Sequence, residues 1–197
     1  HFNQHKYTSL RYKNTLFLIL DTEDHGATRN DEIEAIRNEG IKIYETDGAE
    51  AYEQTVYANL PERKWGHISK SQSDYFIRVI EGNPGVKWIF LLLHKPTWEN
   101  PESANFNAIE KALKGKNYTV FNGHTHIYNH TKRFGQDYIN LATTGGKQFP
   151  EQGLSTDHFL WVTVDNKEVS LANLQMSGVF NKQGKLPVNL NTTNKTN

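Results

Sequence analysis

Four apolar runs, each leading into polar residues, limit the fold of this chain more than any other feature of its sequence. They cover residues 16–20, 88–93, 118–121 and 138–142. Strands that are apolar at every position are typical of sheets covered on both faces, and such sheets are mostly parallel. Helical periodicity lies between the runs. The sequence therefore predicts an α/β fold in which helices flank a β-sheet.

Two segments between these runs have the pattern of amphipathic helices. Ser69 stands three residues before Gln72 in the manner of a capping box, and apolar residues follow at helical spacing until Gly82. Residues 103–113 show the same spacing and are followed by Gly115. We expect further helices at 31–39 and within 49–60, the latter inside a stretch that resembles an insertion.

The C-terminal part of the chain predicts a hairpin and a loose tail. Two β-rich segments, 158–164 and 168–175, flank Asp165-Asn166, which is a turn signal. An antiparallel hairpin would make the predicted sheet a mixed one. We expect residues 1–180 to form the folded part and residues 181–197, which hold five asparagines and few apolar residues, to be a flexible tail.

Composition excludes several classes of protein. The 22 basic and 22 acidic residues balance, so the chain lacks the basic field and the patch expected for nucleic-acid binding. It has no cysteine, which excludes disulfides, thiolate metal sites and cysteine nucleophiles. The longest apolar run is too short to cross a membrane, and no signal peptide is visible, so we expect no membrane partner. The compartment stays open, with a periplasmic or secreted location favoured over the cytoplasm.

Three histidines follow two of the apolar runs. His94 comes directly after Leu93, and the segment Gly123-His124-Thr125-His126 follows the next run. Because ligands bind at the carboxyl ends of strands in open α/β sheets, these side chains are expected at one edge of the sheet. Neutral imidazole is the commonest metal ligand. Each motif alone also fits an ordinary loop or core-edge histidine, but together they predict a metal site.

In these motifs the chain resembles the C-terminal half of a calcineurin-like metallophosphoesterase. The matching segments are residues 16–22, 68–72, 87–96, 121–126 and 138–146. The resemblance covers most of residues 10–175. It implies half of a four-layer αββα sandwich with a mixed sheet. It also implies hydrolysis of a phosphate mono- or diester by a water that two metal ions activate.

The resemblance also implies roles for the three histidines. His94 and His124 would bind one ion and His126 the other, and the two ions would be Mn, Fe or Zn in the divalent or trivalent state. The family's N-terminal motifs, Asp-x-His, Gly-Asp-x-x-Asp and Gly-Asn-His, do not occur in the sequence. We therefore expect the catalytic histidine to lie outside this chain and the chain alone to be inactive. Half a sandwich would expose an apolar face, so association with a missing half or with a second copy is also expected.

One alternative remains open, namely a non-catalytic metal-binding or interaction module derived from the same fold. A cupin-like barrel is disfavoured because no acidic residue follows the His-x-His pair at the required spacing. A serine hydrolase is disfavoured because Ser155 lacks the closing glycine of a nucleophile elbow. We interpret His25, His67 and His130 as surface residues, Asp21 as structural, and residues 143–146 as a tight loop.

Overall fold

The computed structural model describes residues 6–165 and 168–176. These residues divide into two compact units. Of the described residues, the first unit contains 6–124 and 130–140, and the second contains 125–129, 141–165 and 168–176. No helix among the described residues is both long enough and apolar enough to cross a membrane.

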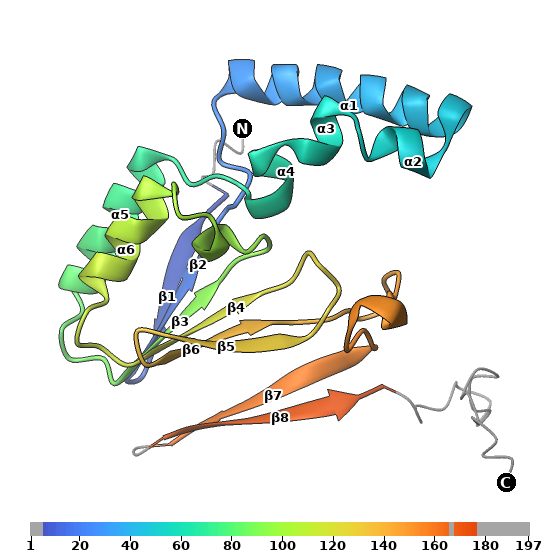
Figure 1. The fold of residues 1–197 in the computed structure, drawn as a ribbon. Helices are drawn as coiled ribbons and strands as arrows, with labels where there is room; N and C mark the ends of the chain where they lie inside the picture. The colour runs from blue at the N-terminus through green and yellow to red at the C-terminus, as the bar shows by residue number, and fades with distance from the viewer. Residues whose placement is uncertain (1–5, 166–167, 177–197) are drawn as a thin grey trace, which may run out of the picture. The chain divides into compact units, whose positions relative to one another are not determined.

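The first unit is built on a six-stranded sheet with the order β1-β2-β3-β4-β6-β5 (Figure 1). Strands β2, β3, β4 and β6 run parallel to one another, and β1 is antiparallel to β2. The predicted α/β class with a mixed sheet is confirmed. The expected source of the mixing was wrong, because the edge strand β1 pairs antiparallel with β2 and the C-terminal hairpin forms a separate sheet. The strands are β1 Thr8–Tyr12, β2 Thr15–Ile19, β3 Trp88–Leu92, β4 Tyr118–Asn122, β5 Asn129–Arg133 and β6 Gln136–Asn140.

Helices α5 (Lys70–Glu81) and α6 (Ala104–Ala112) pack side by side against the sheet (Figure 1). Ser69 caps α5 as predicted, since its hydroxyl accepts a hydrogen bond from the Gln72 backbone N–H at 3.2 Å. The core between these helices and the sheet consists of Leu16, Leu18, Leu20, Ile68, Phe76, Ile80, Ile89, Leu91, Leu93, Trp98, Phe106, Ile109, Leu113, Tyr118, Val120 and Tyr138. Side chains of the apolar runs, on which the predicted fold rests, therefore form much of the buried core.

Between β2 and α5 the chain forms four helices, α1 (Ala27–Asp47), α2 (Ala49–Tyr52), α3 (Val56–Asn59) and α4 (Pro61–Trp65). The helix predicted at 31–39 is thus longer than expected, and the one predicted within 49–60 is broken. The break has a local cause, because Thr55 caps α3 and Pro61 begins α4. In α1 only Gly40 is buried, which explains the weak pattern of this segment.

The second unit contains an antiparallel two-stranded sheet of β7 (His158–Val164) and β8 (Val169–Gln175). This confirms the predicted hairpin, while Asn166 of its turn and the predicted tail at 181–197 lie outside the described residues. His158 is buried and holds the hairpin in place, because its Nε2 accepts a hydrogen bond from the Ala142 N–H at 3.0 Å. The four-layer sandwich stays a prediction.

Candidate metal centre

His94 and His124 lie next to each other at the carboxyl edge of the six-stranded sheet. They follow the adjacent parallel strands β3 and β4, and their ring centroids are 5.3 Å apart in an edge-to-face arrangement. The loops that carry them are joined by a hydrogen bond of 2.9 Å from the Gly123 N–H to the His94 carbonyl. The structure thus brings two of the three predicted ligands together, as parallel strands should.

The ring of His124 is oriented by the backbone of α4. Its Nε2 lies 2.8 Å from the carbonyl oxygen of Arg63. A carbonyl can only accept, so Nε2 carries the hydrogen and, in the neutral ring, Nδ1 keeps its lone pair. Burial lowers the pKa of His124 below its usual value, and the nearby charges of Lys95 and His94 lower it further. At neutral pH the ring is therefore an uncharged imidazole that can bind a metal through Nδ1.

His126 belongs to the second unit and is oriented in the same manner. Its Nδ1 lies 2.6 Å from the carbonyl oxygen of Lys147, so Nδ1 donates and Nε2 is the nitrogen with the lone pair in a neutral ring. A metal-binding histidine commonly donates its other ring N–H to a carbonyl, because that bond fixes the tautomer and the orientation. Both histidines of the Gly-His-x-His segment have this arrangement.

The same two histidines adopt a backbone conformation that side chains disfavour. Their φ angles are +76° for His124 and +60° for His126. The other non-glycine residues with positive φ in the described chain, Lys13 and Phe134, lie in the tight turns β1–β2 and β5–β6. A left-handed residue costs roughly 1–2 kcal/mol, and such residues cluster at functional sites. Two of them within three residues, outside a hairpin turn, mark this loop as a functional candidate.

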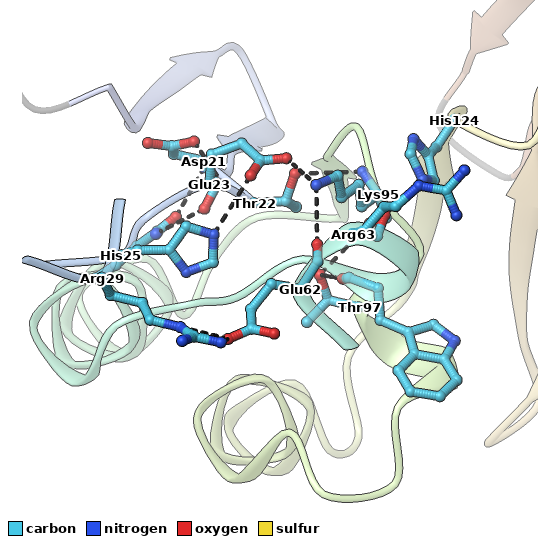
Figure 2. A network of polar contacts seen from close by, with 12 residues as sticks. Asp21, Thr22, Glu23, His25, Arg29, Glu62, Arg63, Lys95, Thr97 and His124 are labelled. Atoms are coloured by element: carbon cyan, nitrogen blue, oxygen red, sulfur yellow. Dashed lines mark hydrogen bonds and ion pairs between the residues drawn. The ribbon is translucent and has the colours of Figure 1, made fainter. Parts of the chain in front are cut away.

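The short helix α4 is attached to the strand-end loops through its own carbonyl groups (Figure 2). The Glu62 carbonyl accepts from Lys95 Nζ at 2.8 Å, the Arg63 carbonyl accepts from His124, and the Trp65 carbonyl accepts from Thr97 Oγ1 at 2.6 Å. The last carbonyls of a helix lack a partner within it, so those of Arg63 and Trp65 are available for such bonds, whereas the Glu62 carbonyl also accepts the Gly66 N–H at 3.0 Å. We call these three carbonyl contacts the α4 clamp. The clamp leaves no signal in the sequence, because its acceptors are backbone carbonyls that every residue has.

Lys95, inside the clamp, also forms an ion pair with Glu23, in which the lysine is largely buried and the carboxylate is about half exposed. Burial would raise the pKa of Glu23, but hydrogen bonds from His25 and Lys95 outweigh it and hold that pKa below its usual value. Glu23 is thus a carboxylate that anchors Lys95. The interpretation of His25 as a surface residue was wrong, because its side chain is only 3% exposed. It lies between Glu23 and the ring of His67, on which it stacks at 5.3 Å.

His67, His130 and Asp21 lie outside the candidate metal centre. His67 is exposed, and so is His130, which pairs with Asp137 at 2.6 Å; both are surface residues as expected. Asp21 Oδ1 accepts a hydrogen bond from the Glu23 N–H at 2.9 Å and so orders the loop after β2, in line with its interpretation as structural. A cavity of about 380 Å³ lies beside the clamp, lined by α1, Tyr57, Arg63 and Lys95.

Residues 143–146 form a tight loop, closed by a hydrogen bond of 2.6 Å from the Gly146 N–H to Thr143 Oγ1. The loop packs against His126 within the second unit. A Cβ atom at Gly146 would lie 3.0 Å from Cε1 and 3.5 Å from Nδ1 of the His126 ring, and it would also overlap Thr143 Oγ1. The absence of a side chain at this position therefore leaves room for the imidazole.

We expect Gly146→Ala to push the His126 ring away from the Lys147 carbonyl and to destabilise the protein by about 1–3 kcal/mol, the usual cost of overpacking. Long-range ¹H–¹⁵N NMR spectra of the imidazoles should show that His126 loses its single tautomer. Gly85→Ala is the control, since a Cβ there meets no atom within 4 Å. An unchanged His126 spectrum in Gly146→Ala would contradict this account of the loop.

Sequence comparisons give no match, either to a model of a known protein family or to a curated protein. Within residues 6–165 and 168–176, no group of three or more His, Cys, Asp or Glu side chains is arranged to hold a metal ion. The two imidazoles of the first unit fit part of one ligand set. A complete ion site needs ligands in addition to them.

Proposed function

We propose that this chain is the histidine-bearing part of a two-metal phosphoesterase that hydrolyses a phosphate mono- or diester. The observation that supports the proposal most is the pairing of His94 with His124 at the ends of two parallel strands. The hydrogen bond to the Arg63 carbonyl adds to it, because it leaves the metal-competent nitrogen of His124 unprotonated.

In this proposal His94 and His124 hold one ion and His126 holds the other. The two histidines of the Gly-His-x-His segment are two residues apart, so the chain keeps their Cα atoms within roughly 7 Å. Bound ions would supply an acidified water and neutralise charge on the phosphoryl group. The chain itself contributes the orientation of the imidazoles through two backbone carbonyls. It also contributes a neutral His124, so no proton has to leave that ring before it binds metal.

The remaining ligands, and the other half of an αββα sandwich, belong in this proposal to protein outside the described residues. They would come from a missing half or from a second copy. Two imidazoles on one ion and one on the other leave several coordination positions to be filled. We therefore expect the chain alone to show almost no turnover of p-nitrophenyl phosphate or bis-p-nitrophenyl phosphate with Mn²⁺. Robust turnover would contradict the assignment of a partial site.

Metal binding tests the proposal directly. We expect Co²⁺ or Zn²⁺ titrated into the chain to bind weakly, and His94→Ala or His124→Ala to weaken that binding by more than about tenfold. His130→Ala is the matched control, since His130 is an exposed histidine far along the sheet that pairs with Asp137. Equal losses in all three variants would show that binding is adventitious and would remove the support for the proposal.

Ester hydrolysis by the completed protein separates the enzyme from the alternative of a non-catalytic module. The complete phosphoesterase binds two ions and hydrolyses phosphate esters, and both properties depend on His94 and His124. A non-catalytic module of the same fold would retain metal binding, with no ester hydrolysis when the missing part is supplied.

A further inference from the structure

The first unit has a second and larger cavity at the end of the sheet opposite to His94 and His124. Its volume is about 930 Å³, which is in the range of small-molecule sites. It lies beyond the C-terminus of α6, beside the first residues of β4 and β6 and the turn between β5 and β6. Its charged and aromatic lining residues include Glu110, Lys111, Lys114, Lys116, Arg133 and Phe134.

The lining carries an excess of positive charge. The ammonium groups of Lys111, Lys114 and Lys116 form no ion pair with any residue that the structure describes. Lys111 lies in the last turn of α6, where a cation interacts well with the helix dipole, but Lys114 and Lys116 lie beyond the helix. The helix dipole therefore does not account for the positive charge of Lys114 and Lys116 at the cavity.

The only carboxylate among the lining residues is already neutralised. Glu110 is buried and accepts hydrogen bonds from Arg133 Nε at 2.8 Å and Arg133 Nη2 at 2.9 Å. It also accepts from the Tyr138 hydroxyl at 2.7 Å, and burial raises the pKa of Tyr138, so that hydroxyl keeps its proton. Glu110 is thus unavailable to the lysines, and their charge remains free for a ligand.

An exposed aromatic ring stands at the same cavity. Phe134 is 69% exposed and has a φ of +53°, followed by Gly135 at +75°. Asn is the usual residue at this position of a two-residue hairpin turn, because a bulky side chain is disfavoured there. The Arg133 guanidinium lies 4.8 Å from the ring centroid and holds one side of it. The ring contributes little to the core, and its exposure leaves it accessible to a ligand in this cavity.

We propose that this cavity binds a nucleotide, whose phosphates contact the lysines and whose base stacks on Phe134. Free ammonium groups attract any polyanion, whereas the ring selects ligands that add a planar group to the charge. The proposal does not depend on the metal centre, because its residues lie at the other end of the strands.

Calorimetric titration of the full chain at low salt tests the proposal, with ADP, pyrophosphate and adenosine as probes. We expect ADP to bind at least about tenfold more tightly than pyrophosphate or adenosine, and its affinity to fall as salt screens the lysines. The double variant Lys114→Gln/Lys116→Gln should lose about tenfold in ADP affinity. Lys42→Gln, at an exposed lysine of α1, should leave the affinity unchanged.

Phe134→Asn is the decisive variant, because it places a favoured residue in the turn while it removes the ring. We expect an about tenfold loss of ADP affinity together with an unchanged or higher melting temperature, which shows that the fold is intact. Equal affinities for ADP and pyrophosphate, or full affinity in Phe134→Asn, would overturn the assignment of a nucleotide. An equal loss in Lys42→Gln would overturn the assignment of this cavity.

Discussion

Replacing Gly66 by alanine is expected to lower the free energy of unfolding by about 2–5 kcal/mol, since a left-handed residue and an overpacked contact each cost energy. Gly66 ends α4 with a φ of +71°, and a Cβ atom there would lie 2.5 Å from the Thr22 carbonyl oxygen. That oxygen is backbone and accepts the His67 N–H, so it cannot move aside without losing a hydrogen bond. Urea unfolding followed by circular dichroism measures the change.

The same substitution should also weaken metal binding, because α4 has to shift away from Thr22. A shift of α4 breaks the clamp, so His124 loses the carbonyl that fixes its tautomer. Loss of such a supporting contact typically costs about 10–100-fold in metal affinity. Gly26→Ala serves as the control, since a Cβ at Gly26 meets no atom within 4 Å. Wild-type stability and metal affinity in Gly66→Ala would show that the clamp does not position His124.

Replacing Glu110 by alanine is expected to destabilise the protein by about 3–5 kcal/mol, the usual cost of breaking a buried ion pair from one side. The Glu110 side chain is 5% exposed and accepts three hydrogen bonds, two from Arg133 and one from Tyr138. Its removal leaves a partly buried guanidinium and a buried hydroxyl without their acceptor. Thermal and urea unfolding measure the loss.

Two further variants decide whether the loss of stability comes from the contacts of Glu110 with Arg133 and Tyr138. Glu102→Ala changes an exposed glutamate just before α6 and should alter stability by less than about 0.5 kcal/mol. Glu110→Met combined with Arg133→Met removes both charges and should recover part of the loss. A cost for Glu110→Ala no larger than that for Glu102→Ala would mean that the ion pair contributes nothing to folding.

The parts of the fold that could be predicted are those whose burial leaves a pattern in the sequence. The apolar run 118–121 predicted β4, which extends one residue further to Asn122, and the segment 158–164 predicted β7 with the bounds that the structure has. Strands β1 and β5 were missed, because both are edge strands whose residues are mostly exposed and polar. The long helix α1 was only partly predicted, since it buries almost none of its surface.

The candidate site also has features that could be predicted from the sequence and features that could not. The proximity of His94 and His124 could be predicted, because two parallel neighbouring strands bring their carboxyl ends together. The burial of His25 could not, since it depends on stacking against His67, which lies beyond the whole insertion in sequence. The positive φ angles of His124 and His126 also left no signal, because histidine itself gives no sign of a left-handed backbone.

The α4 clamp acts through peptide oxygens alone, and this has a consequence for how the insertion can diverge. Any residue with a backbone carbonyl can occupy positions 62, 63 and 65 and still receive the bonds from Lys95, His124 and Thr97. The side chains of α4, and those of the helices before it, can therefore change during evolution without loss of the three hydrogen bonds of the α4 clamp. Two such proteins could share the same imidazole support while an alignment of their sequences showed no similarity in this region.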